Sequence, residues 1–309
     1  MEEHGLTPAA LETQLKNFRE GFPFLPVTRA ASCGDGIRVL DAAGIEQAAA
    51  RYDRAKESLR VVKFVPASGA ATRMFKDLFE FVREGRRTAV VGELLANRRR
   101  FAFWPELRTV ENIVAEGLRY GETPKGLVSF HRYGDEVRKA VEEHLVEGAQ
   151  YAAAGGEVKI HFTVSPEHLT RFEALLAEKI PGYESRFGVK YRISFSVQDP
   201  STDTLAVNPD CTPFRRADGR LLYRPAGHGA LIGNLGKIDA DIVFVKNIDN
   251  VTTDARRGDT VLYKKALAGV LLALQERIFE YLMALEVPGA ELEPIAAFIE
   301  NELCVKLPK

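Results

Sequence analysis

The feature that most constrains the fold of this chain is an apolar run at residues 61–65, which is followed by Pro66 and a series of small residues. A run of this kind is typical of a strand that is buried on both faces of a parallel sheet. Further strands are expected at 157–163, 189–197, 221–224 and 241–246, with helices at 134–153 and 165–178. This alternation predicts an α/β fold, a three-layer, mostly parallel, Rossmann-like sheet with ligands at the carboxyl ends of its strands.

Helices are expected on both sides of this region. Thr7 followed by Pro8 is typical of a helix start, and an apolar stripe continues to about residue 20. A second helix is expected over 44–59, a long amphipathic helix over 255–285 and a last helix over 291–305.

The composition is that of an ordinary globular protein. The 309 residues carry a formal charge of −1, so neither nucleic acid nor an anionic membrane is expected as a partner. The cysteines at 33, 211 and 304 lack the spacing of a disulfide framework or a zinc site, which fits a reducing compartment. With neither a signal peptide nor a membrane span in the sequence, a cytoplasmic location is expected.

The strongest candidate for a binding site is the loop at 66–74, which joins the first buried strand to a helix expected to start near Thr72. Small residues let backbone N–H groups approach phosphate oxygens, and the helix start favours negative charge. The residues in question are Ala67, Ser68, Gly69, Ala70, Ala71, Thr72 and Arg73. The structural alternative is a tight turn with Arg73 on the surface.

Two further segments follow expected strands. Gly227, His228 and Gly229 form a loop in which the glycines permit a close approach, or alternatively a simple glycine turn with a structural histidine. The strand at 241–246 ends near Asp249, whose carboxylate could bind a hard cation such as Mg²⁺ beside nucleotide phosphates. The alternative for Asp249 is a turn in which its side chain caps the backbone.

Together these segments resemble the motifs of the UDP-sugar pyrophosphorylases. The 227–229 loop is similar to their PxGHG loop, Asp249 lies in a match to their N-x-D-N strand end, residues 161–165 resemble their MTS strand, and Gln198 resembles the glutamine of Q-x-x-P. The first loop resembles AGGxGTRL, with Ser68 and Ala71 at glycine positions and Met74 for leucine. The chain also resembles a bacterial domain family of unknown function, seen largely in Bacteroidetes, that groups with GT-A-type nucleotidyltransferases.

The resemblance implies a nucleotidyltransferase of the GT-A fold. A sugar 1-phosphate would attack the α-phosphorus of a nucleoside triphosphate, with UTP favoured, and pyrophosphate would leave. The 67–73 loop and Mg²⁺ would hold the triphosphate, Asp249 would bind the metal, and Gln198 with the 227–229 loop would recognise the base. Arg73 and a lysine would stabilise the developing charge. Lys125 in Pro124-Lys125-Gly126 is the preferred lysine, with Lys76 as the alternative and a solvated surface lysine as the structural reading.

The expected domain organisation has three parts. Residues 1–60 form an N-terminal helical extension, 61–250 a nucleotide-binding domain of the nucleotidyltransferase type, and 251–309 a helical C-terminal segment. In the family, strands of the sugar site follow the N-x-D-N motif, and here the remaining residues are helical. The sugar-binding half is therefore expected to be absent or truncated.

Three other functions are consistent with parts of the sequence. The first is a non-catalytic module that binds a nucleotide or nucleotide-sugar. The second is a GT-A-type glycosyltransferase, whose metal-binding D-x-D would be Asp239-Ala240-Asp241, although this motif precedes its strand. The third is a metal hydrolase, for which the candidates are scattered and form no HExxH motif: His131, Glu143, His144, His161 and His168.

Overall fold

The computed structural model describes residues 4–27, 29–69, 71, 74–104, 109–110, 113 and 123–308. The chain divides into two compact units, one of residues 1–23 and 58–257 and the other of residues 24–57 and 258–309. The second unit thus joins the helix expected over 44–59 to the helical segment expected after the sheet, while the helix expected from Thr7 to about residue 20 belongs to the first unit. Among the described helices, none combines the length and the low polarity that a bilayer span requires.

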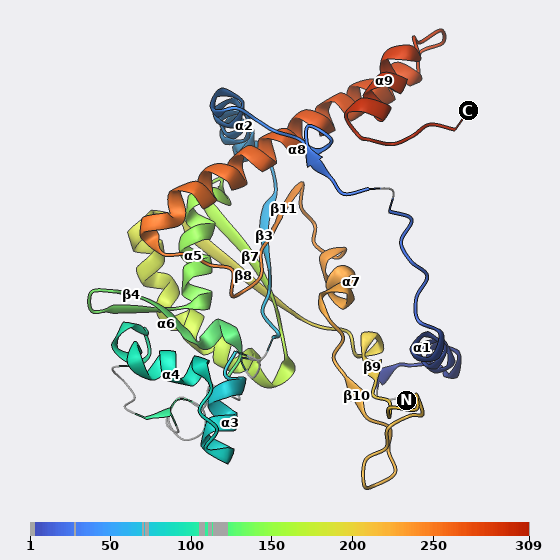
Figure 1. Ribbon diagram of the computed structural model, residues 1–309. Coiled ribbons are helices and arrows are strands. Elements are labelled where there is room, and N and C mark those ends of the chain that lie inside the picture. The colour runs from blue at the N-terminus through green and yellow to red at the C-terminus, as the bar shows by residue number, and fades with distance from the viewer. Residues whose placement is uncertain are drawn as a thin grey trace. The chain divides into compact units, whose positions relative to one another are not determined.

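The first unit is mixed α/β (Figure 1). Its helices are α1 Pro8–Glu20, α3 Lys76–Glu84, α4 Ala89–Ala96, α5 Ala140–Tyr151, α6 Leu169–Phe187 and α7 Ile232–Leu235. Its strands are β3 Val61–Pro66, β4 Ser129–Tyr133, β5 Glu136–Lys139, β6 Ala153–Ala154, β7 Glu157–Val164, β8 Lys190–Val197, β9 Thr204–Leu205, β10 Tyr223–Arg224 and β11 Ile242–Val245. Short 3₁₀ turns include η7 Lys125–Leu127 and η10 His228–Leu231.

The central sheet is mixed, with four parallel strands and one short antiparallel strand. β11 pairs with β3, β3 with β7, and β7 with β8, all parallel, while β6 folds back antiparallel on β7. Ile242 lies opposite Val61 at one end of the β11 and β3 pair, so both strands begin at the same level. Because the long strands run in one direction, the loops that follow β3, β7 and β11 leave from one edge of the sheet.

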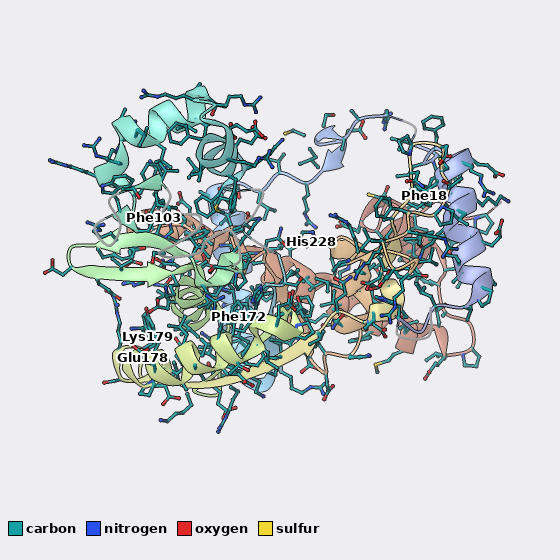
Figure 2. All side chains as sticks on the ribbon, turned by 90° about the horizontal axis from the view of Figure 1, so that it is seen from below. Phe18, Phe103, Phe172, Glu178, Lys179 and His228 are labelled. Atoms are coloured by element: carbon teal, nitrogen blue, oxygen red, sulfur yellow. The ribbon has the colours of Figure 1, made fainter. Side chains whose placement is uncertain are left out.

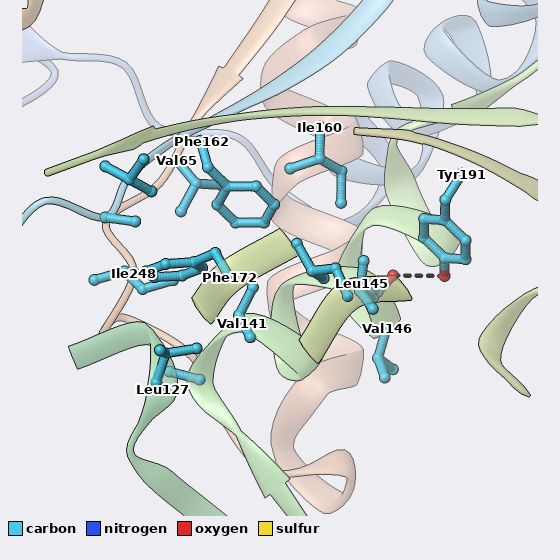
Figure 3. Close-up of a cluster of buried hydrophobic side chains, with 14 of the residues drawn as sticks. Val65, Leu127, Val141, Leu145, Val146, Ile160, Phe162, Phe172, Tyr191 and Ile248 are labelled. Carbon is cyan, nitrogen blue, oxygen red and sulfur yellow. Dashed lines mark hydrogen bonds between the residues drawn. The ribbon is translucent and has the colours of Figure 1, made fainter. Parts of the chain in front are cut away.

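Helices α5 and α6 cover one face of this sheet (Figure 1). Alternate residues of β7 point toward the helices, since successive side chains of a strand face opposite sides. Ile160 and Phe162 pack against Leu145 of α5 and Phe172 of α6, as Figure 3 shows. Burying each such side chain contributes roughly 1.5–3 kcal/mol. The hydroxyl of Tyr191 donates to the carbonyl of Leu145 at 2.9 Å and so ties β8 to α5 (Figure 3).

The second unit consists of β1 Ser32–Cys33, β2 Gly36–Ile37, α2 Ala42–Ala55, most of α8 Arg257–Leu285, and α9 Glu293–Asn301. Helices α2 and α8 approach closely where Gly269 meets the backbone of Ala48. A Cβ added at Gly269 would lie 1.8 Å from the carbonyl oxygen of Ala48, so only glycine permits this contact. Lys265 of α8 also binds Asp53 of α2 at 3.0 Å.

Several expected elements are confirmed. The hydroxyl of Thr7 accepts from the N–H of Ala10 at the start of α1, and the long helix expected at 255–285 is α8. The strands expected at 157–163, 189–197 and 241–246 are β7, β8 and β11 with small shifts in their ends. The helix start expected at Thr72 lies outside the described residues, and α3 begins at Lys76.

Three expectations about elements were wrong. Residues 134–139, expected to be helical, form the turn and second strand of the antiparallel pair β4 and β5, with Gly134 at φ +62°. The strand expected at 221–224 is shortened to β10 and pairs antiparallel with β9 outside the central sheet, because Tyr223 and Leu205 pack with Leu6 and Leu15 near and on α1. Helix α6 runs past residue 178 through Pro181 and ends only at Gly188, with φ +65°.

Candidate functional site

The candidate site lies at the sheet edge where β3, β7 and β11 end. The N–H of Ala67 donates to the carbonyl of Thr163 at 2.8 Å, and the N–H of Ile248 donates to the carbonyl of Pro66 at 3.2 Å. The N–H of Lys125 donates to the carbonyl of Gly69 at 3.1 Å. Backbone hydrogen bonds therefore join the small-residue loop to the segments that carry Lys125 and Asp249.

Lys125 and Asp249 form an ion pair at this edge. The ammonium Nζ of Lys125 lies 2.7 Å from Oδ2 of Asp249, although the residues are 124 positions apart in the sequence. The side chains are 27% and 29% exposed, so each is partly open to solvent and accessible to a small ligand. A cation and a carboxylate that the sequence suggested separately thus lie in contact.

Gly126 explains how the loop holds Lys125 in place. A Cβ added at Gly126 would lie 2.6 Å from Cζ of Phe172 and 3.2 Å from Cγ1 of Ile248. Phe172 projects from α6 into the hydrophobic core and is labelled in Figures 2 and 3. Its ring cannot move away without opening a cavity, so the close approach requires glycine.

His144 fixes the backbone next to Asp249, the acidic partner of the ion pair. This fully buried side chain lies on α5, and its Nε2 donates to the carbonyl of Ile248 at 3.1 Å. Burial lowers the pKa of His144 well below its usual range, and the nearby charge of Lys63 lowers it further. The ring is therefore neutral, with its proton on Nε2, and it fixes the backbone immediately before Asp249.

Beneath this edge lies a buried charge network that the sequence did not indicate. Glu147 of α5 accepts from Lys63 of β3 at 3.1 Å and from Lys246 at 2.6 Å, and Lys63 also donates to the carbonyl of His144 at 3.1 Å. Burial raises the pKa of Glu147, but the two ammonium groups outweigh burial and hold that pKa below its ordinary value. Two lysines with one glutamate leave one positive charge, partly exposed at Lys246, near the strand ends.

The small-residue loop is described only in part. Ala67 and Ala71 are fully buried, Gly69 is exposed with open space around it, and the hydroxyl of Ser165 donates to the carbonyl of Ser68 at 3.3 Å. The positions suggested at Ala70, Thr72 and Arg73 lie outside the described residues.

Lys76, the alternative catalytic lysine, is paired within its own helix. It lies on α3, is 74% exposed, and has its Nζ 3.7 Å from Oε1 of Glu80. It therefore behaves as a surface lysine, and Lys125 is the better candidate on geometry.

The residues suggested for base recognition form a second group. Gln198 donates from Nε2 to the carbonyl of Ala226 at 3.4 Å and to the hydroxyl of Thr202 at 3.2 Å. The glutamine therefore contacts the segment that leads into Gly227, His228 and Gly229. These three residues are exposed where η10 begins, and His228 is labelled in Figure 2.

Asp239 and Asp241, the D-x-D pair of the glycosyltransferase hypothesis, are bound to Arg60. The guanidinium of Arg60 contacts both carboxylates, and its backbone N–H donates to Asp241 at 2.8 Å. The hydrogen bonds from Arg60 lower the pKa of Asp241 to about 2. These residues precede β3 and β11, so they lie at the sheet edge opposite Lys125 and Asp249. At the starts of these strands, Arg60 and the two aspartates therefore form a cluster of ion pairs.

The histidines of the hydrolase hypothesis lie in separate environments. His131 contacts Oε1 of Glu143 at 2.9 Å, and this buried carboxylate also accepts from Tyr133 at 2.7 Å and from Arg257. His161 lies between the hydroxyls of Ser194 and Ser196, at 2.8 Å from each. In the part of the chain that the structure describes, no three His, Cys, Asp or Glu side chains form a metal-binding group.

A hollow of about 440 Å³ lies on the sheet face opposite α5, and several of its polar groups already bind one another. Asn234 donates to Ser196 at 2.8 Å and to the carbonyl of Val197 at 3.0 Å, and Ser196 in turn contacts His161. His161 and Asp239 line this hollow, whereas Lys125, Asp249 and Gln198 do not. The strand edge with Lys125 and Asp249 therefore remains the better candidate site.

The fold and the site define a mixed α/β protein with a cation and a carboxylate paired at the carboxyl edge of parallel strands. The chain belongs to the family described as "Domain of unknown function (DUF4301)", which matches residues 1–113 and 106–309. A search of curated proteins finds no match.

Among solved structures, the chain is similar to the uridine diphosphate N-acetylglucosamine pyrophosphorylase from Trypanosoma brucei, crystallised with an inhibitor. The sequences are 14% identical, and the TM-score is 0.43. The match covers 76% of this chain and 39% of the trypanosomal chain.

Proposed function

We propose that the first unit is a GT-A-type nucleotidyltransferase domain, which binds a nucleoside triphosphate, with UTP favoured, at the carboxyl edge of β3 and β11. The single observation that carries the proposal is the ion pair of Lys125 and Asp249 beside the carbonyl of Gly69. A phosphate-binding cation, a carboxylate and a loop of small residues are the groups that a metal–triphosphate complex needs, and they come together from three separate segments.

The donor set fits a magnesium ion that arrives with its nucleotide. Magnesium is commonly bound by one or two carboxylates, with substrate phosphates and water as the other ligands. Asp249 supplies one partly exposed carboxylate, and the described residues contain no complete metal-binding group that would hold an ion alone. When bound, the metal would neutralise phosphate charge.

The proposed reaction is nucleotidyl transfer to a sugar 1-phosphate. An oxygen of the sugar phosphate forms a bond to the α-phosphorus, the bond from that phosphorus to the bridging oxygen breaks, and pyrophosphate leaves with the electron pair. Lys125 and Arg73 stabilise the charge that develops on the phosphates, and the 67–73 loop donates backbone hydrogen bonds. Asp249 binds the metal, while Gln198 and the 227–229 loop recognise the base.

Thermal shift with UTP, ATP, GTP, CTP and UDP-glucose, each with and without Mg²⁺, tests the proposal. A ligand that binds only the folded protein raises its melting temperature by mass action. A magnesium-dependent shift with uridine nucleotides is expected, and Arg73→Ala and Asp249→Asn should each reduce it. Asp239→Asn is the matched control, because that carboxylate lies at the opposite sheet edge. Folded protein that responds to no nucleotide would overturn the proposal.

Exchange of labelled pyrophosphate into UTP then separates two outcomes. Exchange in the presence of a sugar 1-phosphate and Mg²⁺ supports catalysis. Nucleotide binding without exchange, across a panel of sugar phosphates, would assign the chain to the non-catalytic binding modules.

A further inference from the structure

We infer that the Lys125–Asp249 ion pair makes the binding of metal and of nucleotide phosphate mutually dependent. The inference rests on the proposed function, because it concerns the same site. In the protein without ligand, each of the two side chains is the counterion of the other at 2.7 Å. Asp249 must leave Lys125 to bind a metal, and Lys125 must leave Asp249 to bind a phosphate.

A ligand that takes only one partner leaves the other charge uncompensated. A divalent cation on Asp249 would lie close to the ammonium group of Lys125, which repels it. A phosphate on Lys125 would lie close to the carboxylate of Asp249, which repels it as well. At such short range and with partial burial, these repulsions are much stronger than in bulk water.

A metal and a phosphate that bind together remove both penalties. Asp249 exchanges the ammonium for the metal, and Lys125 exchanges the carboxylate for the phosphate, so every charge keeps an opposite neighbour. The coupling is reciprocal by thermodynamic necessity: whatever factor the metal adds to nucleotide affinity, the nucleotide adds to metal affinity.

The backbone on both sides of the pair is fixed, so a shift of the loops does not readily relieve the competition. Gly126 packs against the core residue Phe172, which limits movement of the Lys125 loop. His144 binds the carbonyl of Ile248 and limits movement of the Asp249 loop. Lys125 and Asp249 therefore exchange partners by motion of their side chains, which are both partly exposed.

The test measures each ligand alone. Mn²⁺ alone, followed by electron paramagnetic resonance, should bind weakly to the wild type and at least about 5-fold more tightly to Lys125→Met, in line with typical coupling factors. UTP in EDTA, followed by isothermal titration calorimetry, should bind weakly to the wild type and about 5-fold more tightly to Asp249→Asn. With Mn²⁺ present, the wild type should bind UTP more tightly than either variant does.

Two surface variants serve as matched controls. Lys76→Met removes an exposed lysine that is paired with Glu80, and Asp239→Asn removes an exposed carboxylate that is paired with Arg60. Both should bind Mn²⁺ and UTP as the wild type does. Circular dichroism melts establish that every variant is folded before binding is compared.

The results separate the two ideas. Equal Mn²⁺ affinity in the wild type and Lys125→Met, together with equal metal-free UTP affinity in the wild type and Asp249→Asn, would overturn the coupling and leave the nucleotide site intact. If the wild type binds no UTP even with Mn²⁺, the proposed function fails, and the coupling, which rests on it, fails as well.

Discussion

Lys63 and Glu147 form an ion pair, with 3.1 Å from Nζ to Oε2, in which neither side chain has any surface exposed to solvent. The pair joins the middle of β3 to α5, directly beneath the candidate site. Glu147 also binds Lys246, so one carboxylate is shared by these two lysines.

Removal of the Glu147 charge should therefore be more damaging than removal of either lysine. Glu147→Gln removes the carboxylate that both ammonium groups contact, of which that of Lys63 is fully buried, and we expect a loss of about 3–5 kcal/mol in the free energy of unfolding. Lys63→Met should cost less, because Lys246 still neutralises Glu147. Urea denaturation measures both values.

The control for this pair is Lys190→Met. Lys190 binds Glu184 at 2.7 Å but is itself 69% exposed, and an exposed ion pair contributes little to stability. A loss at Glu147 no larger than the loss at Lys190 would show that the buried network is not a stability element.

Stability should depend on pH through His144. The folded-state pKa of His144 is lowered, first by burial and then by Lys63, while its unfolded value is about 6.5. The unfolded chain therefore binds the proton more readily, so the stability associated with neutral His144 is fully present above about pH 6.5. It is lost as the pH falls from there toward the folded-state pKa.

His144→Gln isolates this contribution, because glutamine keeps a donor for the carbonyl of Ile248 and does not titrate. Urea denaturation from pH 8 to pH 5 should show a smaller loss of stability in the variant than in the wild type. Two curves that run parallel over this range would contradict the assignment. His161 and His168, whose pKa values are also lowered by burial, contribute equally to both curves.

A methyl group at Gly126 should disturb the site through the core. Gly126→Ala places a Cβ 2.6 Å from the ring of Phe172, and overpacking of this kind costs about 1–3 kcal/mol. Gly69→Ala is the matched variant, because the space around Gly69 is open and the fold should change by less than about 0.5 kcal/mol. Equal stability of the two variants would argue against the rigid Lys125 loop.

A methyl group at Gly269 should separate α2 from α8. The added Cβ would lie 1.8 Å from the carbonyl oxygen of Ala48, which is backbone and cannot rotate away. Hydrogen exchange of the α2 amides should become faster in Gly269→Ala. Gly258→Ala in the same helix meets open space and should leave exchange unchanged or slower, since alanine favours helix over glycine by up to about 1 kcal/mol.

The spacing of apolar residues was sufficient to predict β3 and α8. The apolar run at 61–65 is β3, and the spacing of four between apolar residues at 255–285 is α8. The Pro-Lys-Gly sequence drew attention to Lys125, whose contact with Asp249 no local pattern contains. The roles of both residues in binding stay predictions.

The antiparallel pair β4 and β5 was missed because its sequence carries little strand signal. Residues 129–133 include His131 and Arg132, and residues 136–139 are mainly charged, so the helix expected at 134–153 takes in the second strand of the pair. Their charges have specific partners instead: Arg138 is almost fully buried, and its guanidinium binds Glu136 and Asp254.

Buried charges were missed for a related reason. A lysine within an apolar strand is typical of a surface position. The partner that makes burial of Lys63 tolerable is Glu147, which lies 84 residues later in α5. Only the packing of β3 against α5 brings the two charges together. Sequence patterns of helical or strand period cannot contain a contact of this kind.

The contact between Ala48 and Gly269 has a consequence for synthesis. Helix α2 leaves the ribosome long before α8, and the whole of residues 58–257 is translated between them. During that interval α2 has no Gly269 to pack against, while the sheet with α5 and α6 has all its strands once β11 has emerged. The nascent chain should therefore complete its first unit before its second, and a ribosome stalled once β11 has left the exit tunnel, with α8 still inside it, should carry a folded sheet and an α2 without its partner helix.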